Sequence, residues 1–307
     1  MQMASLAGQA VLVTGASGFI GSHLCRRLVT LGGEVHAVSR KPHGDDGGVR
    51  WMQADVCEIS DVRAIMRTIR PDVVFHLASH VMGSPALEHV LPTFHANLES
   101  TVNLLTAVAE TGCKRIILTG SLAEPEAEKG ERFPSAPYAA AKWAGSGYGR
   151  MFHALYGVPA VLARVFMVYG PEQRDATKLI PYVTLSLLRE KAPQIASGAR
   201  LVDWIYVGDV VEGFIALATT PGIEGATLEL GSGELVPIRE IVRKLEALAG
   251  SHASASFGAL ADRPLEPVRV ADVGHTQATI GWTPRTGLDA GLRQTVQWYR
   301  EHVHEFE

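Results

Sequence analysis

The chain has 307 residues, 47% of them hydrophobic, which suffices for one large or two small domains with a full apolar core. Its formal net charge is -4 and no basic stripe stands out, so we expect no nucleic-acid partner. Strand-sized apolar runs, an N-terminus without a signal-peptide pattern and three widely spaced cysteines predict a cytoplasmic protein with reduced thiols and no membrane span. No metal site is expected, because the H-x-H pair of His302 and His304 has no further ligand cluster beside it.

The first predicted strand, over residues 10–13, runs into a glycine-rich turn and then an amphipathic helix. The turn carries Gly15, Gly18 and Gly21 in a G-x-x-G-x-x-G pattern. Gly15 permits a tight turn, Gly18 a close approach of a ligand, and Gly21 the packing of helix on strand. The free N–H groups and positive dipole end of the helix suit a pyrophosphate, so the pattern predicts a dinucleotide site.

The second predicted strand ends in Ser39, Arg40 and Lys41. In dinucleotide-binding folds this strand end faces the adenosine ribose, where an acidic residue would bind the hydroxyls of NAD. A hydroxyl and two cations suit a 2′-phosphate instead, because a guanidinium pairs with phosphate in a bidentate way. The sequence therefore favours NADP(H) over NAD(H). The alternative is that Arg40 and Lys41 simply lie in solvent at the sheet edge.

Three polar residues follow the next predicted strands. Asp55 suits the adenine amino group, or else Asp55 or Ser60 caps the following helix. His76 ends a continuous apolar strand, and a hydrogen-bonded core histidine is favoured over a ligand-facing one. Asn97 lies near the start of a helical pattern and is either cap-like or a polar group inside the site.

A hydroxyl, a phenol and an amine make up the candidate catalytic group. Ser121 ends the fifth predicted strand, and ligands of open α/β sheets bind at the carboxyl ends of strands. Tyr138 and Lys142 are one helical turn apart and point from one face. An ammonium beside the phenol is expected to lower the phenol's pKa from about 10 toward neutrality, which would make Tyr138 a usable acid or base. Ser121 would hydrogen-bond the same reacting oxygen.

These residues resemble the extended short-chain dehydrogenase/reductase family, which contains the NAD-dependent epimerases and dehydratases of nucleotide sugars. The resemblance runs nearly end to end. It is carried by Thr14–Gly21 (TGASGFIG), Asp55, His76–Ala78 (HLA), Ser121, Tyr138–Lys142 (YAAAK), Ala163–Pro171, Leu201–Val210, Leu228–Val242, Asp262–Asp272 and Ile280–Tyr299.

The resemblance implies an α/β fold, with a doubly wound parallel Rossmann sheet and a smaller C-terminal α/β domain. The cofactor domain is expected at residues 1–165, with segments at about 203–232 returning to it, and a mainly substrate-binding domain at 166–307. The family further implies a nucleoside-diphosphate-sugar substrate and a homodimer formed through two helices, here Phe94–Glu110 and Tyr138–Tyr156.

Site residues follow by position. Expected around the cofactor are Gly15, Gly18, Phe19, Ile20, Gly21, Ser39, Arg40, Lys41, Asp55, Val56, Leu77, Ala78, Ser79, Asn97, Thr119, Tyr138, Lys142 and Val165. The resemblance makes Tyr138 the acid or base and puts Lys142 on the nicotinamide ribose. Expected at the substrate are Ser121, Met167, Arg200 and Arg263, the last of them on the diphosphate.

Several positions depart from the family pattern. Leu122 and Ala123 replace the Asp-Glu pair of the 4,6-dehydratases, which argues against elimination of water by that route. Glu124-Pro125-Glu126 replaces the usual Val-Tyr-Gly, and Met167 replaces an Asn. Val202 stands where family members often have a phosphate-binding Arg, for which Arg200 is a candidate substitute.

The preferred function is an NADPH-dependent 4-ketoreductase of an NDP-4-keto-6-deoxy sugar, in which Tyr138 supplies the proton. Arg40 favours this reading, because a reductase draws on a cytosolic NADPH pool and family epimerases usually keep an acid at that strand end. The alternative is an NDP-sugar 4-epimerase with tightly bound NAD, and a minor one is a non-catalytic NADP-sensing module.

Overall fold

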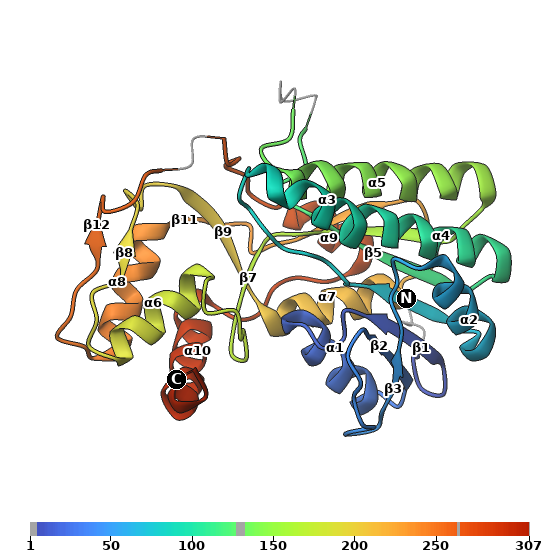
Figure 1. Ribbon diagram of the computed structural model, residues 1–307, viewed down its shortest axis with the longest axis horizontal. Coiled ribbons are helices and arrows are strands. Elements are labelled where there is room, and N and C mark those ends of the chain that lie inside the picture. Colours follow the sequence, from blue (N-terminus) through green and yellow to red (C-terminus); the bar gives the residue numbers. More distant parts are fainter. Residues whose placement is uncertain (1–4, 127–132, 263–264, 307) are drawn as a thin grey trace. The chain divides into compact units, whose positions relative to one another are not determined.

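The computed structural model describes residues 5–126, 133–262 and 265–306, and it divides into two compact units (Figure 1). The first comprises residues 1–165, 211–229 and 275–282, and the second comprises 166–210, 230–274 and 283–307. The segment that returns to the first unit is thus shorter than the expected 203–232. Residues 275–282 form a second return, which the sequence pattern did not indicate.

The first unit is built on a parallel sheet, which confirms the predicted α/β class. Within the described residues, seven strands pair in the order β10-β6-β5-β4-β1-β2-β3. Leu12 of β1 lies opposite His36 of β2 on one side and Val74 of β4 on the other, both in parallel register. The strand order reverses between β1 and β4, and ligands of such folds bind outside the carboxyl ends at this switch point. The strands are β1 (Ala10–Thr14), β2 (Glu34–Ser39), β3 (Val49–Gln53), β4 (Val73–His76), β5 (Arg115–Ser121), β6 (Ala160–Val165) and β10 (Thr227–Leu230).

Helices cover both faces of this sheet. Figure 1 shows α4 and α5 side by side on one face and α1 and α7 on the other. The apolar residues of β1, β4 and β5 pack against α2 and α4 in one core that includes Leu12, Val74 and Leu104. The helical segments are α1 (Phe19–Thr30), α2 (Ile59–Ile69), η1 (Leu87–His89), α3 (Val90–Thr93), η2 (Phe94–Glu99), α4 (Ser100–Thr111), α5 (Pro137–Tyr156), α7 (Val207–Thr219) and α9 (Val273–Ile280).

Small residues let α5 approach β5 closely. Gly145, Ser146 and Gly149 are buried on the inner face of the helix. A Cβ at Gly149 would lie 2.6 Å from Cδ1 of Leu118, so a larger side chain there would push the helix off the strand. Pro137 begins the helix, where a missing N–H costs nothing, and Gly157 ends it in the left-handed conformation. This packing brings the Y-x-x-x-K face of α5 against the end of β5.

The second unit has its own core and two small sheets. β9 pairs in parallel with β7 and antiparallel with β11, while β8 pairs with β12. Buried Asp203 accepts hydrogen bonds from the backbone N–H groups of Ser232, Gly233 and Ala271, which ties β9 to two loops. The elements are β7 (Met167–Tyr169), α6 (Leu179–Leu188), β8 (Gln194–Ile195), β9 (Leu201–Tyr206), β11 (Leu235–Pro237), α8 (Ile238–Ala249), β12 (Ser256–Phe257), α10 (Leu288–His302) and η4 (Val303–Phe306).

Three of the remaining sequence expectations concern membranes, metals and thiols. No described helix is both long and apolar enough to cross a membrane. The described ranges contain no group of three His, Cys, Asp or Glu side chains placed to hold a metal ion, and His302 stacks on Trp298 with ring centroids 4.5 Å apart. Cys25, Cys57 and Cys113 are free thiols.

Candidate active site

The glycine turn between β1 and α1 adopts a conformation that only glycine tolerates well. Gly15 has a φ of +70°, and a Cβ there would lie 2.5 Å from the backbone nitrogen of Ala78. A Cβ at Gly21 would lie 2.2 Å from the carbonyl oxygen of Gly15, so α1 also packs directly on the turn. The first and third glycines therefore let the turn, the helix and the segment after β4 come together.

The N-terminus of α1 fits a pyrophosphate. Gly18 is the N-cap residue, no side chain caps the helix, and its first turn holds no acidic residue. The N–H groups of the first turn, those of Phe19, Ile20 and Gly21, thus lack intrahelical partners and sit at the positive end of the dipole. A negatively charged phosphate is the ligand that satisfies such donors. The residues of this turn therefore fit a bound dinucleotide.

His76 is a hydrogen-bonded core residue, as the sequence favoured. Its Nδ1 lies 2.8 Å from Oγ1 of Thr14, and its Nε2 lies 3.1 Å from Oγ1 of Thr101. Burial, together with the charge of Lys142, lowers the pKa of His76 to about 3, so the ring is neutral. Through these contacts His76 links its own strand, β4, to β1 and to α4.

Asn97 holds the segment that follows β4. Its Oδ1 accepts hydrogen bonds from the hydroxyl of Ser79 (3.1 Å) and the backbone N–H of His80 (2.6 Å), while its Nδ2 donates to the carbonyl of His80 (3.1 Å). Asn97 lies inside η2 and caps no helix. Of the two readings of this residue, the polar group within the site is the one that the structure supports.

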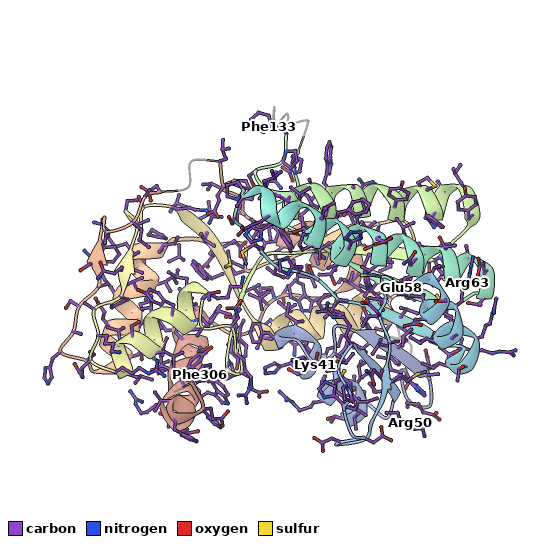
Figure 2. The ribbon with its side chains drawn as sticks, in the orientation of Figure 1. Lys41, Arg50, Glu58, Arg63, Phe133 and Phe306 are labelled. Carbon is purple, nitrogen blue, oxygen red and sulfur yellow. The ribbon has the colours of Figure 1, made fainter. Side chains whose placement is uncertain are left out.

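Arg40 and Lys41 are exposed just past the end of β2, where Figure 2 labels Lys41. The hydroxyl of Ser39 accepts a hydrogen bond from the backbone N–H of Lys41 (3.2 Å). Within the described part of the chain, neither cation makes an ion pair. Both are therefore available to an anion at this strand end.

Asp55 does not cap α2, and neither does Ser60. The helix begins at Ile59 with Glu58 as its N-cap, which puts Ser60 inside the helix. The cap interpretation is therefore wrong for both residues. Oδ1 of Asp55 instead accepts a hydrogen bond from the backbone N–H of Cys57 (2.9 Å) in the preceding turn. Because the side chain of Asp55 hydrogen-bonds within its own turn, it is not available to cap the helix, which begins only after that turn ends.

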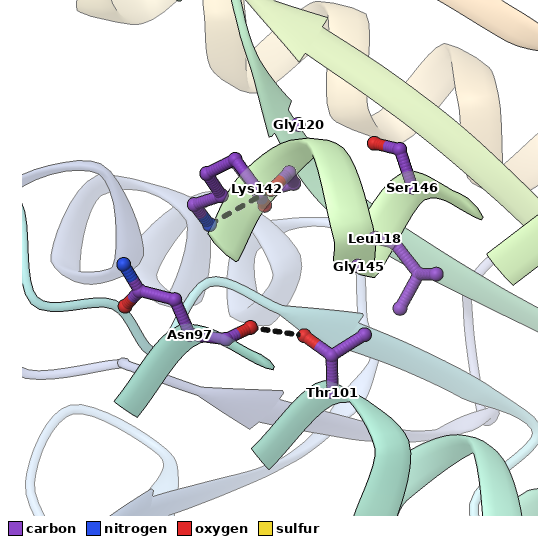
Figure 3. Close-up of a pocket in the computed structure, with 8 residues that line it drawn as sticks. Asn97, Thr101, Leu118, Gly120, Lys142, Gly145 and Ser146 are labelled. Atoms are coloured by element: carbon purple, nitrogen blue, oxygen red, sulfur yellow. Dashed lines mark hydrogen bonds between the residues drawn. The ribbon is translucent and has the colours of Figure 1, made fainter. Parts of the chain in front are cut away.

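The three candidate catalytic side chains lie together. The Tyr138 phenol lies near the hydroxyls of Ser121 and Ser79, and both hydroxyls act to lower its pKa. Nζ of Lys142 donates to the carbonyl oxygen of Thr119 (2.8 Å) and lies 5.9 Å from the centroid of the Tyr138 ring. Figure 3 shows Lys142 reaching from α5 and Asn97 from η2 around a cavity of about 10 Å³, space for one water molecule.

The pKa of Tyr138 corrects the expected electrostatics. Burial, with a contribution from the charge of Glu124, raises this pKa to about 12, although the nearby hydroxyls of Ser121 and Ser79 oppose the rise. Burial also lowers the pKa of Lys142 to about 8. The expectation that Lys142 brings the phenol toward neutrality is therefore wrong for the protein on its own. The ammonium is hydrogen-bonded to Thr119, and desolvation of the phenolate is the largest influence on the phenol.

Glu124 is a site residue that the sequence interpretation missed. It is only 2% exposed, and its Oε1 accepts a hydrogen bond from the backbone N–H of Ser121 (2.7 Å). Burial raises the pKa of its carboxyl. A glutamate in a loop rich in Glu and Pro is usually solvated, so the pattern predicts exposure. The one available signal was its spacing of three residues from Ser121, which suits a turn in which the side chain bonds back.

The remaining cofactor candidates line the carboxyl edge of the first sheet. Leu77 and Ala78 follow β4 directly, where backbone N–H groups bond to Thr14. Oγ1 of Thr119 donates to the carbonyl of His76 (2.8 Å). Val56 follows Asp55, and Val165 ends β6 opposite Ser121.

Apart from Ser121, the substrate candidates belong to the second unit. Met167 is half-buried on β7 opposite Trp204 of β9. Arg200 forms an ion pair with Glu266, so its guanidinium already has a carboxylate partner. Val202 is buried in the core of this unit and Arg263 lies outside the described residues.

The comparisons with known proteins agree on one family. The family model described as "NAD dependent epimerase/dehydratase family" matches residues 11–231. A dTDP-glucose 4,6-dehydratase of Haemophilus influenzae is 28% identical over 330 residues, covering 94% of this chain and 97% of the relative. Among solved structures, MoeE5 in complex with UDP-glucuronic acid and NAD is 30% identical with a TM-score of 0.85, covering 95% of this chain and 99% of its own. The UDP-glucose 4-epimerase of Thermus thermophilus in complex with NAD is 29% identical with a TM-score of 0.83, covering 94% and 98%.

Proposed function

Because the chain belongs to the NAD dependent epimerase/dehydratase family of extended short-chain dehydrogenases/reductases, we propose that this enzyme is an NADPH-dependent 4-ketoreductase of an NDP-4-keto-6-deoxy sugar. The observation that carries the proposal is the proximity of the Tyr138 and Ser121 hydroxyls, with the Lys142 ammonium 5.9 Å from the Tyr138 ring centroid on the same face of α5. Two hydroxyls that already meet can both bond to one carbonyl oxygen of a substrate.

The two hydroxyls have different parts in this reaction. The nicotinamide supplies the hydride when it is bound. Ser121 donates a hydrogen bond to the carbonyl oxygen and stabilises its developing charge. Tyr138 gives that oxygen its proton, and a pKa of about 12 keeps the phenol protonated, as an acid must be, at neutral pH. Lys142 stabilises the phenolate that is left behind, because an ammonium favours the charged form of a neighbouring phenol.

The preference for NADPH rests on the end of β2. Arg40 and Lys41 are exposed there, with Ser39 beside them. A guanidinium pairs with a 2′-phosphate through two parallel hydrogen bonds, whereas an acidic residue would repel it. A reductase also has to exchange its cofactor after each turnover. Because the two cations are exposed, they support both recognition of the 2′-phosphate and exchange of the cofactor.

A 4-epimerase with tightly bound NAD is the second candidate. MoeE5 and the Thermus thermophilus epimerase were both solved with NAD, and both resemble this chain over more than nine-tenths of its length. The 4,6-dehydratase route has less support, because Leu122 and Ala123 follow Ser121 where an acid and a base would be required. A non-catalytic NADP-binding module remains the minor alternative.

A second copy of the chain is the partner that we propose for the helical face of the first unit. Large apolar side chains are exposed on η1, α3, η2 and α5: Leu87, Leu91, Phe94, Trp143, Tyr148 and Leu155. The family resemblance implies a homodimer through Phe94–Glu110 and Tyr138–Tyr156, and η1 and α3 directly precede the first of these segments. Sedimentation of the wild type beside a Leu91→Glu variant tests this: the variant should become monomeric, and an unchanged mass would contradict the proposal.

One experiment separates the candidates. Mass spectrometry identifies the cofactor that the purified protein retains, and a panel of NDP-sugars and NDP-4-keto sugars is then incubated with NADPH or NADH. A reductase consumes NADPH with a 4-keto substrate. Retained NAD, with interconversion of two sugars and no net oxidation, would favour the epimerase over the reductase. Cofactor binding without any turnover would favour the binding module.

A further inference from the structure

Glu124 connects the end of β5 to the catalytic face of α5. Its Oε1 accepts a hydrogen bond from the backbone N–H of Ser121 (2.7 Å), and its carboxylate lies near the hydroxyl of Ser146, since an added Cβ at Gly120 would meet both side chains. Tyr138, Lys142 and Ser146 follow one another at intervals of four residues, so they lie along one face of α5. A single buried carboxylate therefore bonds to the strand that carries Ser121 and lies against the helix that carries Tyr138 and Lys142.

The surroundings of Glu124 are built to hold a side chain of this length. An added Cβ at Gly120 would lie 2.5 Å from Oε1 of Glu124, so a glycine is needed at position 120 for the carboxylate to reach Ser121. The turn is closed by a hydrogen bond from the backbone N–H of Glu124 to the carbonyl of Ser121 (3.1 Å). The loop is held further along as well, where Glu126 pairs with Arg164 of β6 at 2.9 Å.

Charged groups face Glu124 from each element packed against it. Lys142 and Tyr138 approach from α5 and Arg164 from β6, and Arg164 also pairs with Glu126 and with Glu229 of β10 at 2.9 Å. His76 of β4 is neutral. The charge of Glu124 raises the pKa of Lys142, whereas burial lowers it. The same charge raises the pKa of Tyr138, as burial also does.

We propose that Glu124 is a positioning residue of this active site: its buried carboxylate fixes Ser121 against the catalytic face of α5 and places a negative charge behind Lys142. The proposal rests on the proposed function, because it gives Ser121, Tyr138 and Lys142 the parts described above. Glu124 itself contacts no reacting atom. It acts through the backbone of Ser121 and through the charge state of Lys142.

The first test reads the charge state of Lys142 without any sugar substrate. Full-length protein saturated with its cofactor and labelled at lysine Cε is titrated by NMR, with Lys142→Arg to assign the resonance. Glu124→Gln keeps the size of the side chain and its hydrogen-bond acceptor but removes the charge. We expect the midpoint of Lys142 to fall by about one pH unit. Glu126→Gln removes an equal charge two residues along the same loop and should leave the midpoint within a few tenths of a unit.

The second test measures whether Glu124 holds the backbone of Ser121 in place. Glu124→Val removes the hydrogen bond to the backbone N–H of Ser121, so amide hydrogen exchange at Ser121 should speed up by about tenfold or more, whereas Glu124→Gln should change it little. If Glu124→Val does not fold, Glu124→Gln and the NMR titration still decide the charge effect. An unchanged Lys142 midpoint in Glu124→Gln, or the same shift in Glu126→Gln, would overturn the proposal.

The third test uses the pH profile of turnover on whichever substrate the wild type accepts. The alkaline limb of kcat should move to lower pH in Glu124→Gln by the same amount as the Lys142 midpoint, with KM for the cofactor unchanged. A lower kcat at every pH with an unmoved limb would mean a merely structural role and would reject the proposal. If the wild type turns over no sugar, the proposed function fails, while the NMR and exchange results still accept or reject the placement of Glu124.

Discussion

Nζ of Lys142 donates a hydrogen bond of 2.8 Å to the carbonyl oxygen of Thr119. This bond anchors the ammonium to β5, two residues before Ser121, and keeps it 5.9 Å from the centroid of the Tyr138 ring. Burial lowers the pKa of Lys142 to about 8, and Glu124 opposes the fall. The amine is therefore the group of this site whose charge changes just above neutral pH.

Activity should decline as pH rises through about 8, because the neutral amine no longer stabilises a Tyr138 phenolate. The sign follows from the lowered pKa, since Lys142 is charged below that value and loses its charge above it. Initial rates between pH 6 and 10 measure this decline, which is the alkaline limb of the pH profile. Lys142→Arg keeps the charge at all these pH values and should lose the alkaline limb even if its rate is lower. A limb that persists in this variant would assign it to another group.

Tyr138→Phe should lower kcat by about 10²- to 10⁴-fold, because the acid is removed while the ring still packs in place. Cofactor affinity, measured by quenching of tryptophan fluorescence, should stay within about twofold of the wild type. Tyr148→Phe is a matched control on the exposed side of the same helix and should leave kcat unchanged. Undiminished turnover in Tyr138→Phe would remove Tyr138 as the acid.

Arg40→Ala should weaken NADPH binding by about 10- to 100-fold, the value of a charge-assisted hydrogen bond, and leave NADH binding nearly unchanged. Arg50→Ala is the control, because Arg50 pairs with Glu34 at the beginning of β2 and so lies near the opposite edge of the sheet. Both affinities are measured by fluorescence enhancement of the reduced cofactor. A preference for NADPH that survives in Arg40→Ala would assign the selectivity to other residues, and equal binding of NADH by the wild type would remove the main support for the reductase.

Gly15→Ala should lower the free energy of unfolding by about 2–5 kcal/mol and abolish cofactor binding. Two costs add, because the backbone at Gly15 is left-handed and a Cβ would lie 2.5 Å from the nitrogen of Ala78. Gly8→Ala separates them, since Gly8 has the same φ of +70° with no atom within 4 Å of an added Cβ. The control should lose only about 1–2 kcal/mol in urea unfolding and bind cofactor normally. Equal losses in both variants would mean that the contact with Ala78 carries no weight.

Much of the fold and of the candidate site is encoded in local pattern. Continuous apolar runs such as Val73–His76 predict buried parallel strands, because both faces of a parallel sheet are covered. The left-handed Gly15 and the pairing of Tyr138 with Lys142 follow from short spacings, which depend on backbone geometry alone. For that reason the glycine turn and the Y-x-x-x-K face appear in the structure where the sequence predicts them.

Tertiary packing decided what these groups experience. Desolvation depends on every neighbour that excludes water, so no spacing could show that the pKa of Tyr138 rises while that of Lys142 falls. Nor could a spacing show that Glu124 is buried beneath Ser121 or that Arg200 is paired with Glu266. The sequence by itself determined the fold class and the meeting of Ser121, Tyr138 and Lys142 at the end of β5. Only the packing of β5 against α5 decided their charge states, because burial and Coulomb interactions act through space rather than along the chain.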